Sequence, residues 1–172
     1  MKPRLHRNSY RSGGRSVRRI AVGLGLVCAL GAAGLATTRT GRADSPTGRY
    51  TISSDTVVDN TTSLSWQAVP AATTYVWTDA VTYCQGLNLG GSSSWRVPTI
   101  GELETLVDDS RTVPAIDPKA FANTATDSDY WTSSTVSGFG STYAYGVNFQ
   151  NGGSIFHFGM NYLHVRCVSS SP

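Results

Sequence analysis

The stretch WRVPTIGEL, Trp95 to Leu103, lies near the middle of the chain and shapes the interpretation of everything around it. Thr99 and Glu102 have the spacing of a capping box. In that motif the threonine oxygen accepts a hydrogen bond from the amide three residues on, and the glutamate side chain reaches back to the threonine amide. The stretch therefore predicts the start of a short helix just after Thr99.

The residues around this cap predict a structural role for the whole stretch. Leu103, Leu106 and Val107 would form the apolar stripe of the helix. Trp95 is expected to be buried beside the turn, and Arg96 to hold backbone carbonyls or a carboxylate in place. A general acid or base would need a partner, and no histidine or cysteine lies near in the sequence. The predicted structural residues are Trp95, Arg96, Thr99 and Glu102.

The upstream stretch TDAVTYCQGLNLGG predicts another helix. Thr78 can cap its start, and Gly90–Gly91 would stop it. Ala80, Cys84 and Leu87 fall on one face of this helix. Cys84 is therefore expected on the buried side.

Most of the remaining chain predicts short strands. Residues 49–67, RYTISSDTVVDNTTSLSWQ, suit two strands with a turn near Asp59 and Asn60, and residues 130–135, YWTSST, suit another. Residues 163–168, LHVRCV, predict a final strand that turns Cys167 and Arg166 to opposite faces.

Between them, residues 141–159, STYAYGVNFQNGGSIFHFG, alternate in the manner of strands. The sequence Asn151-Gly152-Gly153 predicts a hairpin turn within this segment. Four side chains are expected on one face: Tyr143, Tyr145, Val147 and Phe149.

The N-terminal region has the pattern of a secretory signal. A basic head precedes the apolar run Ile20 to Ala36, and Gly41 and Ala43 form a small-x-small cleavage site. We predict a signal peptide over residues 1–43 and a single domain over residues 44–172, with a secreted, periplasmic or cell-surface location. The alternative is an uncleaved membrane anchor, because the run approaches the length needed to span a bilayer.

Residues 44–172 carry five basic and eleven acidic side chains, a net charge of −6, and no basic patch. We therefore expect no nucleic-acid partner, and no contact with the membrane after cleavage. This segment keeps two cysteines, Cys84 and Cys167. An even pair in a small exported domain predicts a disulfide, and two buried free thiols are the alternative.

The stretches TVVDNTTSLSWQ, AVTYCQGLNLGGSSSWRVPTIGELETLVDDS, AIDPKAF, YWTSST, and VNFQNGG through VRCV occur in that order. Over nearly all of residues 47–168 this order resembles the Lcl C-terminal domain family, a set of exported bacterial modules. The resemblance implies an α+β, C-type lectin-like fold, with two short helices flanking small twisted antiparallel sheets. It also implies one disulfide between the first helix and the last strand, and Cys84 and Cys167 fall on those positions.

Two departures limit what the resemblance implies. The segment Arg96–Thr99 is similar to the RLPT signature of formylglycine-generating enzymes, but the separate cysteine pair those enzymes need is missing from residues 44–172. Sugar-binding C-type lectins hold calcium through Glu-Pro-Asn or Gln-Pro-Asp and Trp-Asn-Asp steps, and neither occurs here. Enzymatic activity and calcium-dependent sugar binding therefore do not carry over.

Few residues suggest a metal. His157 and His164 have no cysteine or carboxylate at a metal-ligand spacing. We expect no cofactor, with a calcium site in the acidic stretch as the alternative to a solvated loop. The carboxylates of that stretch are Asp108, Asp109, Asp117, Asp127 and Asp129.

The function that these observations favour is a non-enzymatic binding or adhesion module for a glycan or a cell-surface protein. The alternatives are an inert structural envelope domain, and a hydrolase or modifying enzyme for which no nucleophile and base can be named. The oligomeric state stays open. Recognition is expected in the late strands and their loops, where Val147 and Phe149 are excluded as core residues. The candidate ligand-binding residues are Asn148, Gln150, Asn151, His157, Asn161 and Tyr162.

Overall fold

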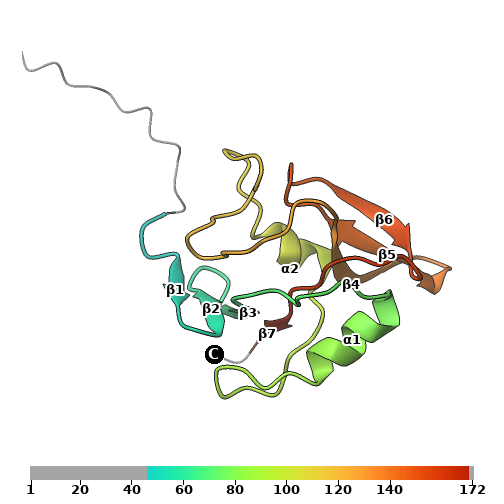
Figure 1. Cartoon of the computed structure of the whole chain (residues 1–172), viewed down its shortest axis with the longest axis horizontal. Helices are drawn as coiled ribbons and strands as arrows, with labels where there is room; N and C mark the ends of the chain where they lie inside the picture. Colours follow the sequence, from blue (N-terminus) through green and yellow to red (C-terminus); the bar gives the residue numbers. More distant parts are fainter. Residues whose placement is uncertain (1–45, 171–172) are drawn as a thin grey trace, which may run out of the picture. The chain divides into compact units, whose positions relative to one another are not determined.

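The computed structural model of the chain describes residues 46–170, so the predicted signal peptide lies outside the described residues. The described elements are, in order, β1 (Tyr50–Ile52), β2 (Thr56–Asp59), β3 (Leu64–Gln67), α1 (Trp77–Gln85), α2 (Ile100–Glu104), β4 (Tyr130–Val136), β5 (Gly140–Val147), β6 (Ser154–Phe158) and β7 (Val168–Ser169). One sheet has the order β1-β2-β3-β7 and the other β4-β5-β6, both antiparallel (Figure 1). Both helices pack against β4 and β5. The α+β class is therefore confirmed. Within residues 46–170 no helix has the length and apolar character needed to span a membrane.

The first sheet has one more strand than the sequence predicted for residues 49–67. The turn after Asp59 joins β2 to β3 as expected, but β1 forms a further hairpin with β2. An ion pair between Arg49 and Asp59, with Nη2 and Oδ2 3.0 Å apart, fastens the start of β1 to the end of β2. Burial acts to raise the pKa of the Asp59 carboxyl. The Arg49 guanidinium helps to outweigh this effect, and the pKa is lowered overall.

Helix α1 begins and ends earlier than predicted. Thr78 does not cap it, because the helix already starts at Trp77 and no side chain caps its first turn. The backbone amide of Trp77 instead donates to the carbonyl of Gly159, 2.9 Å away. Gly86, not the Gly90–Gly91 pair, forms the C-terminal cap. A contact from a distant part of the chain thus sets the start of this helix.

Helix α2 confirms the predicted capping box. The Thr99 hydroxyl oxygen accepts from the Glu102 amide at 3.2 Å, and Glu102 Oε2 accepts from the Thr99 amide at 2.8 Å. The helix is short, five residues from Ile100 to Glu104. Leu103 and Leu106 are fully buried behind the cap, so the motif places both leucines in the core.

The disulfide between Cys84 and Cys167 is present, with Cα atoms 5.6 Å apart. It lies in an apolar cluster that includes Trp95, Trp131 and Val165. A second cluster lies between the two sheets and α2. The bridge ties α1 to the end of the chain, as the family resemblance implies.

The segment 163–168 corrects the prediction of a regular final strand. Only Val168 and Ser169 join the first sheet, paired with Trp66 and Ser65 of β3. Leu163 and His164 make isolated bridges to other segments. The chain is extended, but its partners change along its length.

The predicted alternation along this segment does hold, because Cys167 and Arg166 point to opposite sides. Both sides are nevertheless buried, and Arg166 is fully enclosed. Arg166 Nη1 donates to the carbonyls of Gln67 and Ala68 at 2.9 and 2.8 Å, and its guanidinium lies 4.9 Å from the centre of the Phe121 ring. Burial lowers the pKa of Arg166 to about 10. Arg166 therefore joins the end of the chain to β3.

Candidate functional site

The β5–β6 hairpin carries the candidate site. Val147 pairs with Ser154, and the chain reverses over residues 148–153, which confirms the predicted turn. Gly152 has φ +81°, and a Cβ atom at this position would lie 2.6 Å from Val107 Cγ1. Only glycine satisfies both conditions without strain. The turn therefore lies close against the residues that follow α2.

A polar pocket lies at this end of the hairpin. Its volume is about 250 Å³. We call it the turn pocket; its lining residues are Asp129, Asn148, Asn151, Gly153, Ser154 and Ile155. It combines a carboxylate, two amides and a hydroxyl with one apolar side chain, Ile155, which is 57% exposed.

Asp129 organises the turn pocket. It is only 8% exposed, and its two carboxylate oxygens accept from different partners. Oδ2 accepts from His157 Nε2 at 2.6 Å, and Oδ1 accepts from the side-chain amide of Asn148. An ionised carboxylate has about four acceptor positions, so capacity is left after these two bonds. The carboxylate is held in a fixed orientation and can still accept from a ligand.

The two asparagines are also fixed in place. The Asn148 side-chain oxygen accepts from the Gln150 amide at 2.7 Å, and the Asn151 oxygen accepts from the Gly153 amide at 2.9 Å. Local bonds of this kind are typical of asparagine in turns. Their side chains are therefore already oriented before any ligand arrives.

His157 is held on both sides. Its ring lies edge-on to Trp131, with centroids 6.0 Å apart. A Cβ atom on Gly146 would come within 3.0 Å of Asp129 Cβ and 3.2 Å of His157 Cδ2, so the missing side chain leaves space for the pair. The histidine acts here as a support for the Asp129 carboxylate.

The face of the β5–β6 hairpin opposite to Ile155 and His157 is aromatic and partly exposed. We call it the aromatic face; its residues are Phe139, Tyr143, Tyr145, Phe156 and Phe158. Cross-strand pairing sets Tyr143 opposite Phe158 and Tyr145 opposite Phe156. Phe156 and Phe158 are 53% and 47% exposed. Contiguous exposed rings of this kind commonly mark an interaction surface.

The four side chains predicted to share one face of β5 and the following turn differ in burial. Val147 and Phe149 are fully buried, as expected for core residues. Tyr143 and Tyr145 are only half-buried and contact the exposed phenylalanines. The apolar cluster between the two sheets and α2 covers this face only at its Val147 end, so the other half faces solvent.

A family model for the Lcl C-terminal domain matches residues 55–169. The chain belongs to this family. The match confirms the resemblance and includes the disulfide, the turn pocket and the aromatic face. The comparison with curated proteins gave no match.

In this Lcl C-terminal domain, the strands that carry both features contain no charged side chain. From Tyr130 to Val165 the chain contains no Asp, Glu, Lys or Arg. Among the residues that line the turn pocket, Asp129, which directly precedes this segment, brings the one formal charge. The Asp109 carboxylate lies beside the turn, since its Oδ1 would be 3.9 Å from a Cβ atom on Gly152. The lining therefore offers no cationic side chain to an anionic ligand.

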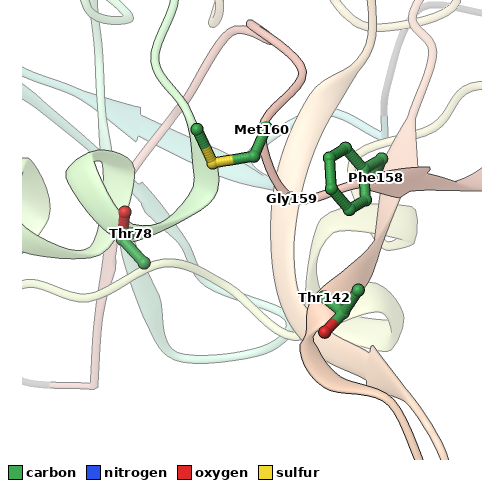
Figure 2. Close-up of a pocket in the computed structure, with 5 residues that line it drawn as sticks. All are labelled: Thr78, Thr142, Phe158, Gly159 and Met160. Atoms are coloured by element: carbon green, nitrogen blue, oxygen red, sulfur yellow. The ribbon is translucent and has the colours of Figure 1, made fainter.

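A second pocket lies at the other end of β6 (Figure 2). Its volume is also about 250 Å³, and we call it the helix-end pocket. Thr78 comes from α1, Thr142 from β5, and Phe158, Gly159 and Met160 from the end of β6 and the residues after it. Two hydroxyls and two apolar side chains line it, without the fixed polar network of the turn pocket.

The six predicted ligand-binding residues of the Lcl C-terminal domain fall into two groups. Asn148 and Asn151 line the turn pocket, and His157 supports it through Asp129. The structure does not bring the other three to this pocket. Gln150, Asn161 and Tyr162 are exposed and line neither the turn pocket nor the helix-end pocket.

Asp129 lies at the centre of the candidate site, and sequence reasoning did not place it there. It was placed among the acidic residues considered for calcium. In the structure Asp127 pairs with His164, with Oδ1 and Nε2 3.0 Å apart, and Asp108 pairs with Arg111 at 2.8 Å. Asp117 accepts from the Lys119 amide at 2.9 Å. Within residues 46–170 no group of three or more His, Cys, Asp or Glu residues could hold a metal ion.

The stretch WRVPTIGEL of this Lcl C-terminal domain, Trp95 to Leu103, has a structural role and lines neither the turn pocket nor the helix-end pocket. Trp95 is buried, and its indole donates to the Ser92 carbonyl at 2.9 Å. Both terminal nitrogens of the Arg96 guanidinium donate hydrogen bonds to the Glu102 carboxylate, at 2.8 and 2.6 Å. These bonds, with smaller contributions from Thr99, lower the pKa of Glu102 to about 2 despite its burial. The predicted carboxylate partner of Arg96 is Glu102 itself.

Proposed function

We propose that the chain is an exported, non-enzymatic binding module that recognises a neutral glycan in the turn pocket, on a C-type lectin-like frame. The observation that carries this proposal is the convergence of Asp129, Asn148 and Asn151 on one pocket in fixed orientations. Pockets that combine a few oriented polar groups with apolar walls are typical of small-ligand sites.

The chemistry of the lining fits sugar hydroxyls. A hydroxyl can donate to the Asp129 carboxylate and accept from an asparagine amide at the same time. Ile155 offers an exposed apolar wall against which the C–H groups of a sugar ring can pack. No lysine or arginine lies between Tyr130 and Val165, so nothing in that segment would balance a carboxylated or sulfated sugar. This favours a neutral glycan over an acidic one.

Export is supported by two observations. The chain belongs to the Lcl C-terminal domain family, which fits an exported module, and Cys84 and Cys167 form a disulfide. Disulfides persist in oxidising compartments outside the cytosol.

A binding role is favoured over catalysis by the surroundings of His157. A carboxylate and a histidine are two members of a nucleophilic triad, which also needs a hydroxyl or thiol within hydrogen-bond reach. Among the described residues, the imidazole of His157 hydrogen-bonds with Asp129 alone. Its ring also packs against Trp131. The pair therefore fits an orienting role better than an acid–base role.

The test is an array of neutral and acidic glycans probed with the natural chain and with two variants. Asn148→Ala removes an amide from the turn pocket, and Gln150→Ala removes an exposed amide from the same turn as a matched control. We expect binding to neutral glycans that is lost in Asn148→Ala and kept in Gln150→Ala, and that a calcium chelator does not change. Thermal unfolding would establish that both variants are folded.

Other outcomes would contradict the proposal. Equal loss in both variants, or binding to acidic glycans alone, would remove the turn pocket from recognition. Turnover of a hydrolase substrate panel that depends on His157 would favour an enzyme. Absence of any glycan signal would favour a cell-surface protein ligand or a structural envelope domain.

A further inference from the structure

The outer edge of β6 is the exposed edge of the second sheet. In the order β4-β5-β6, the strands at the two edges are β4 and β6. The edge of β4 is covered, because the Trp131 amide donates to the His164 carbonyl at 2.9 Å and the Ser133 amide to the Pro98 carbonyl at 2.7 Å. Within residues 46–170, no segment pairs with the outer edge of β6.

The backbone groups that point outward from β6 can be identified from the ladder. The Gly159 amide donates to Thr142, and the Asn148 amide donates to Gly153, so the odd-numbered residues of β6 face β5. In an antiparallel ladder the bonded positions alternate along the strand. The N–H and C=O groups of Ser154 and Phe156 and the N–H of Phe158 therefore point away from the sheet.

Natural edge strands usually carry a lysine, a proline or a bulge that prevents pairing with another chain. The sequence of β6, Ser-Ile-Phe-His-Phe, has no lysine and no proline, and its register with β5 is continuous. Ile155, Phe156 and Phe158 are all about half exposed or more. The edge is open, neutral and apolar.

We propose that β6 pairs antiparallel with β6 of a second copy of this chain, about a two-fold axis at Phe156. This inference goes beyond the proposed function and does not depend on it. The register brings the outward groups of each strand opposite those of the other. The opposed side chains are Phe156 with Phe156 of the second copy, Ser154 with Phe158, and Ile155 with His157.

A second copy fits this edge for two reasons. None of the opposed pairs sets two like charges against each other, which would oppose cross-strand pairing, and aromatic pairs favour it. Directly opposed residues point to the same face of a sheet, so Phe156 and Phe158 of both copies would extend the aromatic face across the axis. The two three-stranded sheets would become one six-stranded sheet.

Sedimentation equilibrium of the full chain tests the proposal. The natural chain should show a weight-average mass that rises toward twice the monomer mass with concentration. Phe156→Lys places two lysines opposite each other at the axis and should raise the dimer dissociation constant by about tenfold or more. Phe139→Lys adds the same charge to the aromatic face away from the edge and should leave the constant within about twofold. All three proteins carry the same N-terminal segment. Association through that segment would therefore be equal in all three and would not produce a difference between them.

Amide hydrogen exchange gives an independent measurement that needs no variant. The Phe156 amide should exchange fast in dilute protein and slow in concentrated protein, because pairing protects it. The amides of Ile155 and His157 face β5 and should be protected at both concentrations. A natural chain that stays monomeric, a Phe156→Lys variant that associates like the natural chain, or a Phe156 amide whose exchange is independent of concentration would overturn the proposal.

Discussion

Replacing Glu102 by glutamine should destabilise the fold in a pH-dependent manner. Glu102 accepts two bonds from Arg96 and closes the capping box of α2 by accepting from the Thr99 amide. Glutamine keeps the shape and one acceptor oxygen but removes the negative charge. The charge-dependent part of these bonds is therefore what the substitution measures.

The size of the effect follows from the pKa of Glu102, which is lowered from 4.5 to about 2. One pKa unit corresponds to about 1.4 kcal/mol, so this shift sets an upper bound of roughly 3.5 kcal/mol. The Arg96 side chain is 41% exposed, and solvent screening weakens the pair. We expect glutamine to lower the free energy of unfolding by about 1 to 2 kcal/mol at neutral pH.

The sign of the pH dependence is fixed by the direction of the shift. Because the folded-state pKa is lowered, the carboxylate stabilises the fold fully above the unfolded-state pKa near 4.5. That contribution is lost as the pH falls toward 2. The difference between the natural chain and Glu102→Gln should therefore shrink steadily between about pH 5 and pH 2.

Urea unfolding of both proteins across this pH range measures the difference directly. Glu104→Gln is the matched control, because Glu104 is exposed at the end of the same helix. It should change the free energy of unfolding by less than about 0.5 kcal/mol at any pH. A difference for Glu102→Gln that is the same at pH 7 and pH 2.5, or equal to that of Glu104→Gln, would refute the reasoning.

Three further substitutions or measurements test interactions that hold the fold together. Thr99→Ala should lower the free energy of unfolding by about 0.5 to 2 kcal/mol without changing glycan binding; lost binding in a variant with unchanged melting would contradict a purely structural role. Mass spectrometry of unreduced peptides from exported protein should find Cys84 linked to Cys167, and two alkylatable thiols would contradict the bridge. Gly152→Ala should destabilise the chain more than Gly91→Ala in thermal unfolding, because both glycines have φ near +80° but only Gly152 has a side chain within 3 Å of the added carbon; equal losses would show that the contact with Val107 is unimportant.

Features that depend on local sequence were predictable. The capping box needs only Thr99 and Glu102, which are three residues apart, and both of its bonds form. The disulfide follows from two remaining cysteines in a segment expected to be exported. The hairpin at Asn151 to Gly153 follows from turn chemistry. In the capping box and the hairpin the deciding interaction lies within the motif itself, whereas the disulfide joins cysteines 83 residues apart and was predictable from their number.

Features that depend on distant contacts were not predictable. The start of α1 is set by the Gly159 carbonyl, far along the chain from Trp77. Alternation correctly grouped Tyr143 with Val147, but it carries no information about where the covering core ends. The wrong start of α1 and the missing information on exposure have one cause, because tertiary packing decides both the ends of helices and the exposure of strand faces.

The candidate site shows the same limit. Asn148 and Asn151 were identified because they lie in a turn, where polar side chains are available to a ligand. Their relation to Asp129 arises only when β4 and β5 pair, since Asp129 directly precedes β4. No spacing in the sequence links Asp129 to His157, so the centre of the pocket required the structure.

The central claim is that the turn pocket holds the ligand, and an NMR titration tests it most directly. The titrant is the neutral glycan with the strongest array signal, added to isotope-labelled natural chain. We expect saturable shifts of the side-chain amides of Asn148 and Asn151 and of the backbone amides of Ser154 and Ile155, which line the pocket. Shifts confined to Thr142, Phe158 and Met160 would place the ligand in the helix-end pocket, and the absence of any saturable shift would contradict glycan recognition by this domain.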